Sequence, residues 1–329
     1  MTDSADAQLM SRAAWLYSLG GMNQEETAAR LGMTRARVNR ILQQARETGI
    51  VSITIDTRDN GMLELEDRIA AEFGLERCIC TPALGLAEAV AREPALAEFP
   101  RRAVGSVAAR LLREILSGQP EALIGTGWGR TLDQITRQIA GLSAQRARFV
   151  SLMGSLTANS AFNPFEVVQA LARATGGEGY FLPVPFIADS AEDREILMSQ
   201  RTVKDVLHMA RNTDIAFISV GELTETSLLR QSGMISAGEL CGLREAGAVG
   251  DTNGIFFGAD GKPVAHDLNA RTLAVGFAAL GRSHTVLLSA GMEKSFATRA
   301  LLRSGIIRTL IIDGDAAHAL MEDTRPASA

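Results

Sequence analysis

Apolar residues recur every three or four positions along three consecutive segments of the first 56 residues, and this spacing predicts three short helices. The expected helices run over about 4–19, 23–31 and 34–48. The stretch 50–55 alternates apolar and polar residues, which predicts a strand in a small wing beside the helices. The residues expected to face the core of this unit are Leu9, Ala13, Leu16, Leu19, Ala28, Ala29, Leu31, Val38, Ile41, Leu42 and Ala45.

Polar caps and a glycine indicate where these helices begin and end. Asn23, with Glu26 three positions later, has the pattern of a capping box, and Thr34 can cap the third helix. Gly32 lies between the second and third helices and can adopt the left-handed conformation that ends a helix. Two short helices joined by a glycine turn are typical of a helix-turn-helix unit.

From residue 75 onward, short apolar runs alternate with helical patterns. The runs are nearly continuous in apolar residues, which is typical of parallel strands that are covered on both faces. We therefore predict an α/β fold with a mostly parallel sheet. The expected strands are 77–81, 122–125, 148–152, 179–184, 214–221, 285–290 and 308–313, and a small β insertion is expected over 255–264. The expected helices are 103–116, 131–139, 164–174, 192–211, 294–302 and 315–321.

A polar segment at 56–61 separates the two parts of the chain, and a helix is predicted over 62–73. That helix could pair with a partner subunit or pack on the larger domain, and the sequence leaves both alternatives open. We expect three regions: residues 1–56, a linker and helix over 57–74, and a large domain over 75–325.

Composition excludes several classes of protein. The chain has 329 residues, of which 46% are hydrophobic and 22% are charged, as in globular proteins, so extensive disorder is excluded. The net charge of −5 excludes a polycationic coat for nucleic acids. The three cysteines do not fit a disulfide framework or a four-ligand zinc site, and a cytoplasmic location is expected because neither a signal peptide nor a membrane-spanning run is recognised.

The third predicted helix lies in a locally basic region. Residues 28–46 contain five arginines and no acid. Arg can donate two hydrogen bonds to guanine in the major groove, and Asn can pair with adenine. A solvated arginine-rich face is the alternative, but it does not account for the capped helices and the glycine turn. The residues predicted to contact DNA are Gln24, Thr34, Arg35, Arg37, Asn39 and Arg40.

A glycine-rich segment follows the strand predicted at 122–125. Its alternating glycines would let backbone N–H groups face a ligand beside the positive end of a helix. It matches neither a dinucleotide-binding fingerprint, which would need glycine in place of Arg130, nor a phosphate-binding loop with Gly-Lys-Ser/Thr. The residues predicted to bind a small molecule here are Gly125, Thr126, Gly127, Trp128, Gly129, Arg130 and Thr131.

Two charged residues follow other predicted strands. Asp251 could accept hydrogen bonds from sugar hydroxyls or cap a turn. Lys294 begins a helix at the carboxyl edge of the sheet, where it could bind an anion or be a surface lysine. Residues 149–172 contain no cation, so a polyol, a sugar or a monophosphate is favoured over a doubly phosphorylated ligand.

Catalytic and metal-binding patterns are not recognised in the sequence. The four histidines are scattered, and the adjacent pair His266 and Asp267 would point to opposite faces of a strand, which favours a solvated loop. We therefore predict no catalytic residue, no metal ligand and no cofactor.

Taken together, these segments resemble the SorC-type family of sugar-responsive transcriptional regulators. The resemblance spans nearly the whole chain. It depends on residues 23–46 followed by 49–55, on 124–132, 214–221 and 250–257, and on 290–302 with 306–313.

The resemblance implies a large domain similar to the sugar-phosphate isomerase and glucosamine-phosphate deaminase fold, which would bind a sugar, polyol or sugar phosphate without converting it. It also implies operator DNA as a partner, with no membrane, and a homodimer or homotetramer whose DNA affinity changes when the effector binds. The effector contacts would be residues 125–131, Asp251 and Lys294. An isomerase or deaminase with an appended DNA-binding unit is the alternative. It would need a base, for which Asp251 or the pair His266–Asp267 are the candidates.

Overall fold

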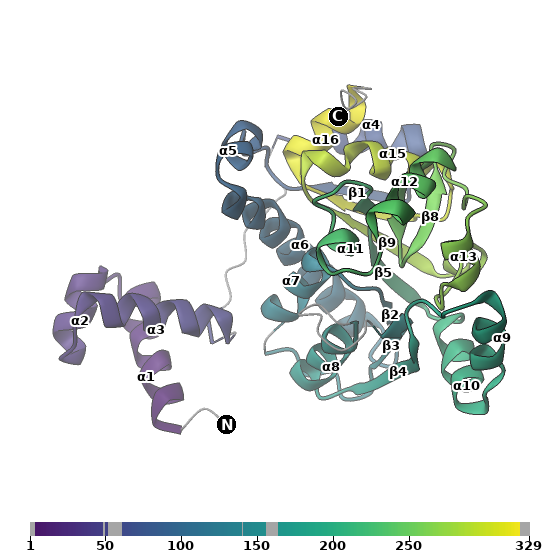
Figure 1. The fold of residues 1–329 in the computed structure, drawn as a ribbon. Coiled ribbons are helices and arrows are strands. Elements are labelled where there is room, and N and C mark those ends of the chain that lie inside the picture. The colour runs from purple at the N-terminus through teal and green to yellow at the C-terminus, as the bar shows by residue number, and fades with distance from the viewer. Residues whose placement is uncertain (1–3, 49, 52–60, 140, 156–163, 323–329) are drawn as a thin grey trace.

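The computed structural model describes residues 4–48, 50–51, 61–139, 141–155 and 164–322 (Figure 1). Its α-helices are α1 Ser4–Ala14, α2 Gln24–Leu31, α3 Arg35–Glu47, α4 Leu63–Phe73, α5 Ala87–Arg92, α6 Glu98–Gly118, α7 Arg130–Gln138, α8 Pro164–Thr175, α9 Ala191–Ser199, α10 Arg201–Ala210, α11 Leu228–Gln231, α12 Ala237–Glu245, α13 Asp267–Arg271, α14 Phe277–Leu280, α15 Ser295–Arg303 and α16 Gly314–Met321. A π-helical turn, η1 Trp15–Leu19, and two 3-10 turns, η2 Pro94–Ala97 and η3 Met292–Lys294, complete the helical elements. The strands are β1 Arg77–Cys80, β2 Leu123–Thr126, β3 Arg148–Ser155, β4 Glu178–Pro185, β5 Ile215–Ser219, β6 Gly221–Glu222, β7 Ala248–Thr252, β8 Ile255–Gly258, β9 His284–Ser289 and β10 Thr309–Ile312.

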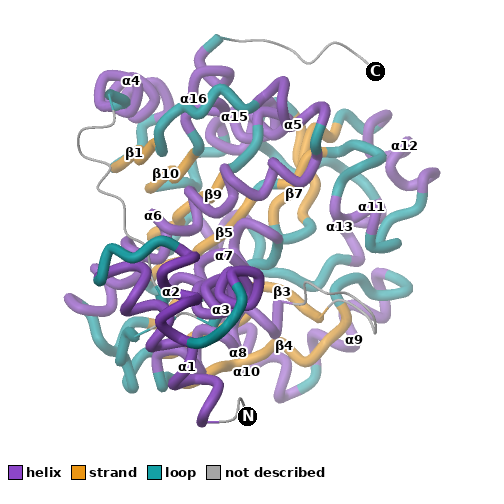
Figure 2. The backbone as a smooth tube through the Cα atoms, turned by 90° about the vertical axis from the view of Figure 1, so that its left-hand side faces the viewer, coloured by secondary structure: helices purple, strands orange, loops and turns teal. Residues whose placement is uncertain are grey.

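Seven of these strands form one sheet in the order β1-β10-β9-β5-β2-β3-β4. Every neighbouring pair in it is parallel, which confirms the predicted parallel sheet. Figure 2 shows β1, β10, β9 and β5 following one another across the large domain. Chain order reverses between β5 and β2, since β3 and β4 extend the sheet to one side and β9 and β10 extend it to the other. In open α/β sheets, ligands bind beside the carboxyl ends of the strands at such a point.

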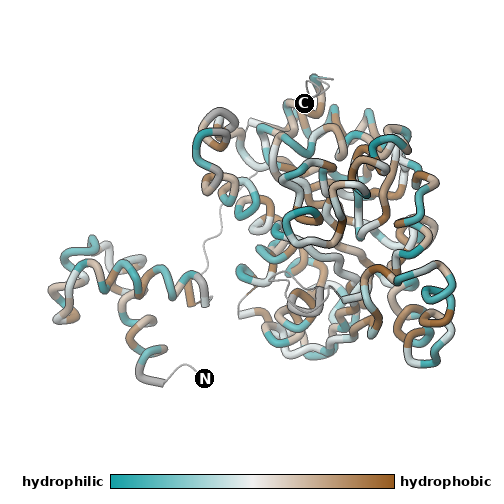
Figure 3. The backbone as a smooth tube through the Cα atoms, viewed as in Figure 1, coloured by the Kyte–Doolittle hydropathy of each residue, from teal (hydrophilic) through white to brown (hydrophobic). Residues whose placement is uncertain are grey.

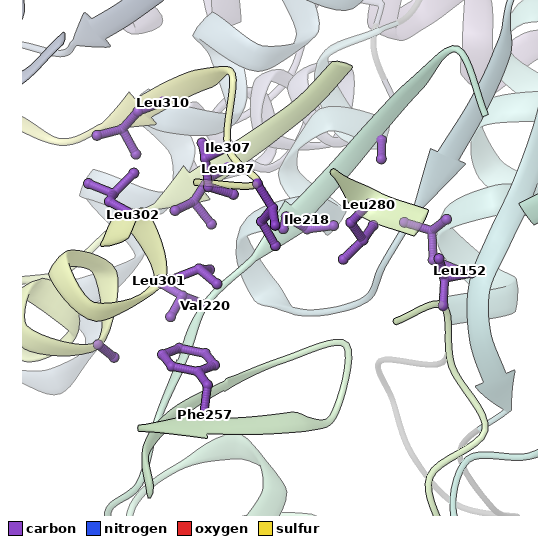
Figure 4. Packing of buried hydrophobic residues seen from close by; sticks show 14 of the residues in the cluster. Leu152, Ile218, Val220, Phe257, Leu280, Leu287, Leu301, Leu302, Ile307 and Leu310 are labelled. Atoms are coloured by element: carbon purple, nitrogen blue, oxygen red, sulfur yellow. The ribbon is translucent and has the colours of Figure 1, made fainter. Parts of the chain in front are cut away.

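Alternate residues of the strands enter two separate hydrophobic cores. Along β5, Ile215 and Phe217 belong to the core beneath α6, α7 and α8, whereas Ala216 and Ile218 belong to the core beneath α4, α10, α15 and α16. Figure 4 shows part of the second core, with Ile218, Leu287 and Leu310 of the sheet near Leu301 and Leu302. Because both faces are covered, the strands need apolar side chains at nearly every position, which is the pattern read from the sequence.

Helix α4 packs on the larger domain, which was one of the two alternatives left open. Leu65 and Ile69 are buried in the core that also contains Cys78 and Cys80 of β1. The Glu66 carboxylate accepts a hydrogen bond of 2.7 Å from the backbone N–H of Cys80. Burial raises the pKa of Glu66 above its ordinary value. The segment after the predicted linker is therefore fixed to the edge strand β1.

Two parts of the large domain differ from the prediction. The single helix expected over 192–211 is two helices, because Gln200 adopts an extended backbone between α9 and α10. A second, antiparallel sheet in the order β6-β7-β8 was predicted only in part, as the insertion at 255–264. Strands β7 and β8 are joined by Asn253 and Gly254, which have φ of 48° and 72° and form the two-residue turn favoured in hairpins.

The N-terminal helices α1, α2 and α3 have a core of their own. It contains Met10, Ala13, Ala28, Val38, Ile41, Leu42 and Ala45. Leu19 was predicted to join this core and does not, since it is 71% exposed. The π-helical turn over 15–19 has more residues per turn than an α-helix, so the three-to-four spacing no longer holds there. Ala29 is also exposed, on the outer side of α2.

In Figure 3 much of α3 has hydrophilic colours, as expected of a helix with one buried stripe. The predicted wing strand lies outside the described residues from 52 to 55, as does most of the predicted linker at 56–61. No described helix has both the length and the apolar character needed to cross a membrane.

Candidate functional site

A small cavity lies where β2 and β5 end, at the reversal of the strand order. Its volume is about 40 Å³, room for about three water molecules. Four segments provide its walls: the loop after β2, the chain from β5 into β6 and α11, the β7–β8 hairpin, and η3. The lining residues are Trp128, Gly129, Arg130, Thr131, Ser219, Val220, Gly221, Glu222, Ser227, Leu228, Leu229, Asp251, Asn253 and Lys294.

The glycine-rich segment contributes only its second half to this cavity. Gly125 is inside β2, where a Cβ atom would come within 2.6 Å of Leu152 Cδ2. The N–H of Gly127 donates to Phe217 O at 3.0 Å, so it does not point at a ligand. Gly129 has φ of 127°, a conformation that favours glycine, and places Arg130 and Thr131 at the start of α7.

The β7–β8 hairpin brings Asp251 to the cavity from a different direction than expected. Asp251 lies within β7 and pairs with Gly221 of β6, whereas the sequence predicted that it follows a strand that ends at Gly250. Its Oδ2 accepts a hydrogen bond of 3.1 Å from the N–H of Gly254. Its pKa is raised to about 7, mainly by burial and also by the nearby Glu222, while the hydrogen bond from Gly254 and the charge of Lys294 oppose this rise.

Lys294 is buried, with 7% of its surface exposed, so the alternative of a surface lysine is excluded. Desolvation lowers its pKa, and the pKa is also lowered by Arg101 and Arg130 but raised by Glu222 and Glu293. The pKa of Arg130 is likewise lowered, mainly by burial. Two cations and two carboxyl groups thus line one small cavity.

Three polar side chains at the cavity contain buried atoms without a hydrogen-bond partner in the described part of the chain. These atoms are Thr131 Oγ1, Ser227 Oγ and Asn253 Nδ2. Thr126 Oγ1, at the end of β2, is also buried and has no hydrogen-bond partner among the described residues. A buried hydroxyl or amide without a partner costs about 1–3 kcal/mol. Several such atoms around one cavity indicate a polar ligand that supplies the missing partners.

Sequence reasoning missed Glu222, Ser227, Asn253 and Arg101. The Asn-Gly pair at 253–254 is a hairpin signal that would have placed Asn253 in a turn. Arg101 is only 6% exposed and forms an ion pair of 3.0 Å with Glu98, yet nothing in the pattern of α6 distinguishes it from its neighbour Arg102. Glu222 follows a buried strand, and the sequence around it has no pattern that distinguishes it from an ordinary loop.

The second candidate surface is the exposed side of α3. Arg35, Arg37, Asn39 and Arg40 are all exposed, as predicted. Thr34 caps the helix by accepting a hydrogen bond from the N–H of Arg37 at 3.3 Å, and Asn23 and Glu26 form the predicted capping box of α2. Gly32 has φ of 66° and ends α2, as predicted.

Gln24 connects α2 with α3 through its side-chain amide. Its Nε2 donates to Asn39 Oδ1 at 3.2 Å, and its Oε1 accepts from Arg35 Nε at 3.4 Å. Two of the candidate DNA-contacting side chains are therefore held by the first residue of the preceding helix.

The pair considered as an acid or base has a structural role. His266 caps α13, its Nδ1 accepting from the N–H of Leu268 at 3.2 Å, and Asp267 forms an ion pair of 2.6 Å with Arg271. Neither residue lines the cavity. Within the described ranges, no group of three or more His, Cys, Asp or Glu side chains is arranged to hold a metal ion.

Known proteins resemble this chain over almost its full length. A family model of sugar-binding domains, Sugar-bind, matches residues 57–322. The erythritol catabolism regulatory protein EryD of Brucella abortus is 37% identical over 317 residues, covering 96% of this chain and 97% of its own. The transcriptional regulator LsrR of Klebsiella pneumoniae is 29% identical, with 96% and 94% covered. Among solved structures, the full-length sorbitol operon regulator SorC from Klebsiella pneumoniae superposes with a TM-score of 0.71 at 24% identity, covering 97% of this chain and 100% of that one.

Proposed function

This chain belongs to the Sugar-bind family of SorC-type regulators, and on that basis we propose that it is a transcriptional regulator of a carbohydrate or polyol catabolic operon. A small sugar, polyol or sugar phosphate would bind the cavity at the end of β2 and β5 and change the affinity of the protein for operator DNA. The relative EryD is named for erythritol catabolism, which makes a polyol operon a specific candidate.

One observation supports the proposal that the cavity binds an effector. Thr131, Ser227 and Asn253 present to one cavity buried polar atoms that have no partner among the described residues, at the position where open α/β sheets bind ligands. A hydroxylated ligand would satisfy these atoms and accept further hydrogen bonds from Lys294 and Arg130. The proposed effector contacts are Trp128, Gly129, Arg130, Thr131, Asp251 and Lys294, with Gly125, Thr126 and Gly127 shaping the strand end behind them.

For the DNA-binding half, we assign α2 and α3 as a helix-turn-helix within residues 1–56. The helix α3 would enter the major groove, with Arg35, Arg37, Asn39 and Arg40 toward bases and phosphates and Thr34 at its N-terminus. Gln24, at the N-terminus of α2, could bond a phosphate while its side chain holds Arg35 and Asn39. Residues 57–74 would join this unit to the effector domain, 75–325, for which we retain the similarity to the sugar-phosphate isomerase and deaminase fold.

The effector-binding and DNA-binding parts of the protein must be coupled through a difference in effector affinity. An effector shifts DNA binding only if it binds the DNA-bound and free arrangements with different affinities, and such coupling typically amounts to about 1–3 kcal/mol. A homodimer or homotetramer would read two half-sites separated by about 10 base pairs or a multiple of this, so we expect a palindromic operator.

We further propose that the cavity binds its ligand without converting it. Of the two candidate bases, the pair His266–Asp267 caps and braces α13 away from the cavity. Asp251 alone would remain, already holding the N–H of Gly254. Turnover of sugar phosphates by the purified protein would contradict this part of the proposal.

The test is operator binding by the full chain, measured at fixed salt with and without a panel of sugars, polyols and their phosphates. Operator sequences can be selected from a randomised duplex library. We expect at least one compound to change the affinity for the selected DNA by about fivefold or more. Failure to select any DNA sequence, or selection without a response to any compound, would overturn the proposal.

A further inference from the structure

The charges around the cavity nearly cancel. Arg130 and Lys294 line the cavity together with the carboxyl groups of Glu222 and Asp251. Behind them, Arg101 is already paired with Glu98 at 3.0 Å, and Glu293 lies close enough to raise the pKa of Lys294. Among the described residues, three cations and four carboxyl groups therefore influence one another's charge at this cavity.

Glu222 lines the cavity together with both cations. Glu222 raises the pKa of Arg130, and among the neighbouring charges it has the largest effect on the pKa of Lys294. The positive potential of both cations is therefore already partly offset by Glu222. It also raises the pKa of Asp251, whose carboxyl group lies against Gly221, the neighbour of Glu222 in β6. With only 9% of its surface exposed, Glu222 is screened by solvent much less than a surface carboxylate.

From this arrangement we infer that the effector is an uncharged polyol or sugar, and that Glu222 is the residue that discriminates against its phosphorylated form. This inference deepens the proposed function and rests on it. A hydroxyl group can donate to the Glu222 carboxylate and accept from Lys294 at the same time. A phosphate dianion can use the cations only by approaching Glu222, and in a buried site such like-charge contact is unfavourable.

The size of the cavity supports the same ligand class. About 40 Å³ accommodates only a few heavy atoms, so even a four-carbon polyol has to displace part of the wall. Residues 227–229 of the wall are Ser227 and the start of α11, a single turn of helix. Ser227 is the N-cap of α11 but makes no side-chain cap hydrogen bond. A phosphate ester would add four heavy atoms to the parent compound, one phosphorus and three oxygens, and would need a larger rearrangement.

The experiment measures binding by titration calorimetry on the full chain. The ligands are erythritol and a panel of four- to six-carbon polyols and sugars, each beside its monophosphate, with inorganic phosphate as a competitor. We expect an unphosphorylated compound to bind at least tenfold more tightly than its own phosphate, and inorganic phosphate not to displace it. A phosphate ester that binds more tightly than its parent compound would overturn the inference while leaving the proposed function intact. If no compound binds or alters DNA affinity, both fail.

The variant Glu222→Gln tests the role of this residue. It retains the shape and an acceptor oxygen but removes the charge, so we expect the neutral ligand to bind about fivefold more weakly and its phosphate to bind about tenfold more tightly. The matched control is Glu192→Gln, the same change at an exposed position in the first turn of α9, which should alter neither affinity. A folded Glu222→Gln variant, with unchanged circular dichroism, that leaves the preference for neutral ligand unaltered would refute the assignment to Glu222.

Discussion

The side chain of Asn253 occupies the space that a side chain on Gly127 would fill, since a Cβ atom built on Gly127 comes within 2.3 Å of Asn253 Oδ1. Gly127 follows β2 of the parallel sheet, and Asn253 is in the turn of the antiparallel hairpin. This contact joins the two sheets at the cavity. It also explains why a glycine is needed at a position whose N–H is not directed at a ligand.

The variant Gly127→Ala would push Asn253 away from β2. We expect a loss of about 1–3 kcal/mol in the free energy of unfolding, typical of overpacking, and weaker effector binding. Chemical denaturation and calorimetry measure the two effects. Gly118→Ala serves as the control, because a Cβ at Gly118 has no atom within 4 Å. Equal stability of the two variants would contradict the contact.

Replacing Lys294 by methionine removes a buried cation while keeping the length of the side chain. We expect at least tenfold weaker effector binding and unchanged affinity for DNA without effector, because a cation that lines the cavity is lost. Lys262→Met is a suitable control, since the side chain of Lys262 is 81% exposed. An effector response preserved in Lys294→Met would exclude this residue from the site.

The buried carboxyl group of Asp251 makes stability depend on pH. Its pKa rises from 3.8 to about 7 on folding, so the folded state holds a proton that the unfolded state has lost. The free energy of unfolding contributed by this group therefore falls as the pH rises from about 4 to 7, by at most about 4 kcal/mol at about 1.4 kcal/mol per pKa unit.

The variant Asp251→Asn should lose this dependence, although Glu222, Lys294 and Arg130 still face the site. Urea denaturation at pH 5, 6, 7 and 8 measures the difference between variant and parent. We expect the variant to gain stability relative to the parent between pH 5 and 7 and to show no further change above pH 8. Parallel pH profiles would show that Asp251 is ionised throughout.

Gln24→Ala removes the side chain that holds Arg35 and Asn39. Because these residues would then reorient freely, we expect weaker discrimination between selected and scrambled DNA, with a smaller loss of affinity for scrambled DNA. Measurements of binding to both duplexes at the same salt concentration separate the two effects. An equal loss on both duplexes would mean that Gln24 acts only as a phosphate contact.

Arg37→Ala tests direct reading of a base. If Arg37 donates two hydrogen bonds to a guanine, its removal should cost about 1–3 kcal/mol on the selected operator and relax selection at one position. Repeating the selection from the randomised library shows which position is affected. Uniform weakening on every sequence, with a smaller slope of affinity against salt, would assign Arg37 to a phosphate instead.

The sequence was informative where a pattern has one physical cause. The nearly continuous apolar runs identified all seven strands of the parallel sheet, because strands buried on both faces require such runs. The helix caps at Asn23 and Thr34 were also predicted correctly, since a side-chain oxygen at the start of a helix has a defined partner. The break within 192–211 was not predicted, because Gln200 adopts an extended backbone in a segment that contains no glycine or proline to mark it.

The site was predicted less completely than the fold. The loop after β2 and Lys294 were found because they follow strands of the parallel sheet. Asp251 was expected just after a short strand over 248–250, whereas it lies within β7 and reaches the cavity from the small antiparallel sheet. Glu222 and Ser227 were missed since their positions depend on how the chain after β5 turns back over the cavity, which no spacing in the sequence encodes.

The walls of the cavity come from segments that are distant in the chain. In the sequence, more than half of the proposed effector domain lies between Arg130 and Lys294. A bound molecule would therefore act as a non-covalent cross-link, closing long loops that the empty protein must close by packing alone. Occupancy at a hundredfold excess over the dissociation constant would add about 2.7 kcal/mol of stability. Protection from proteolysis should then report the presence of the metabolite inside a cell.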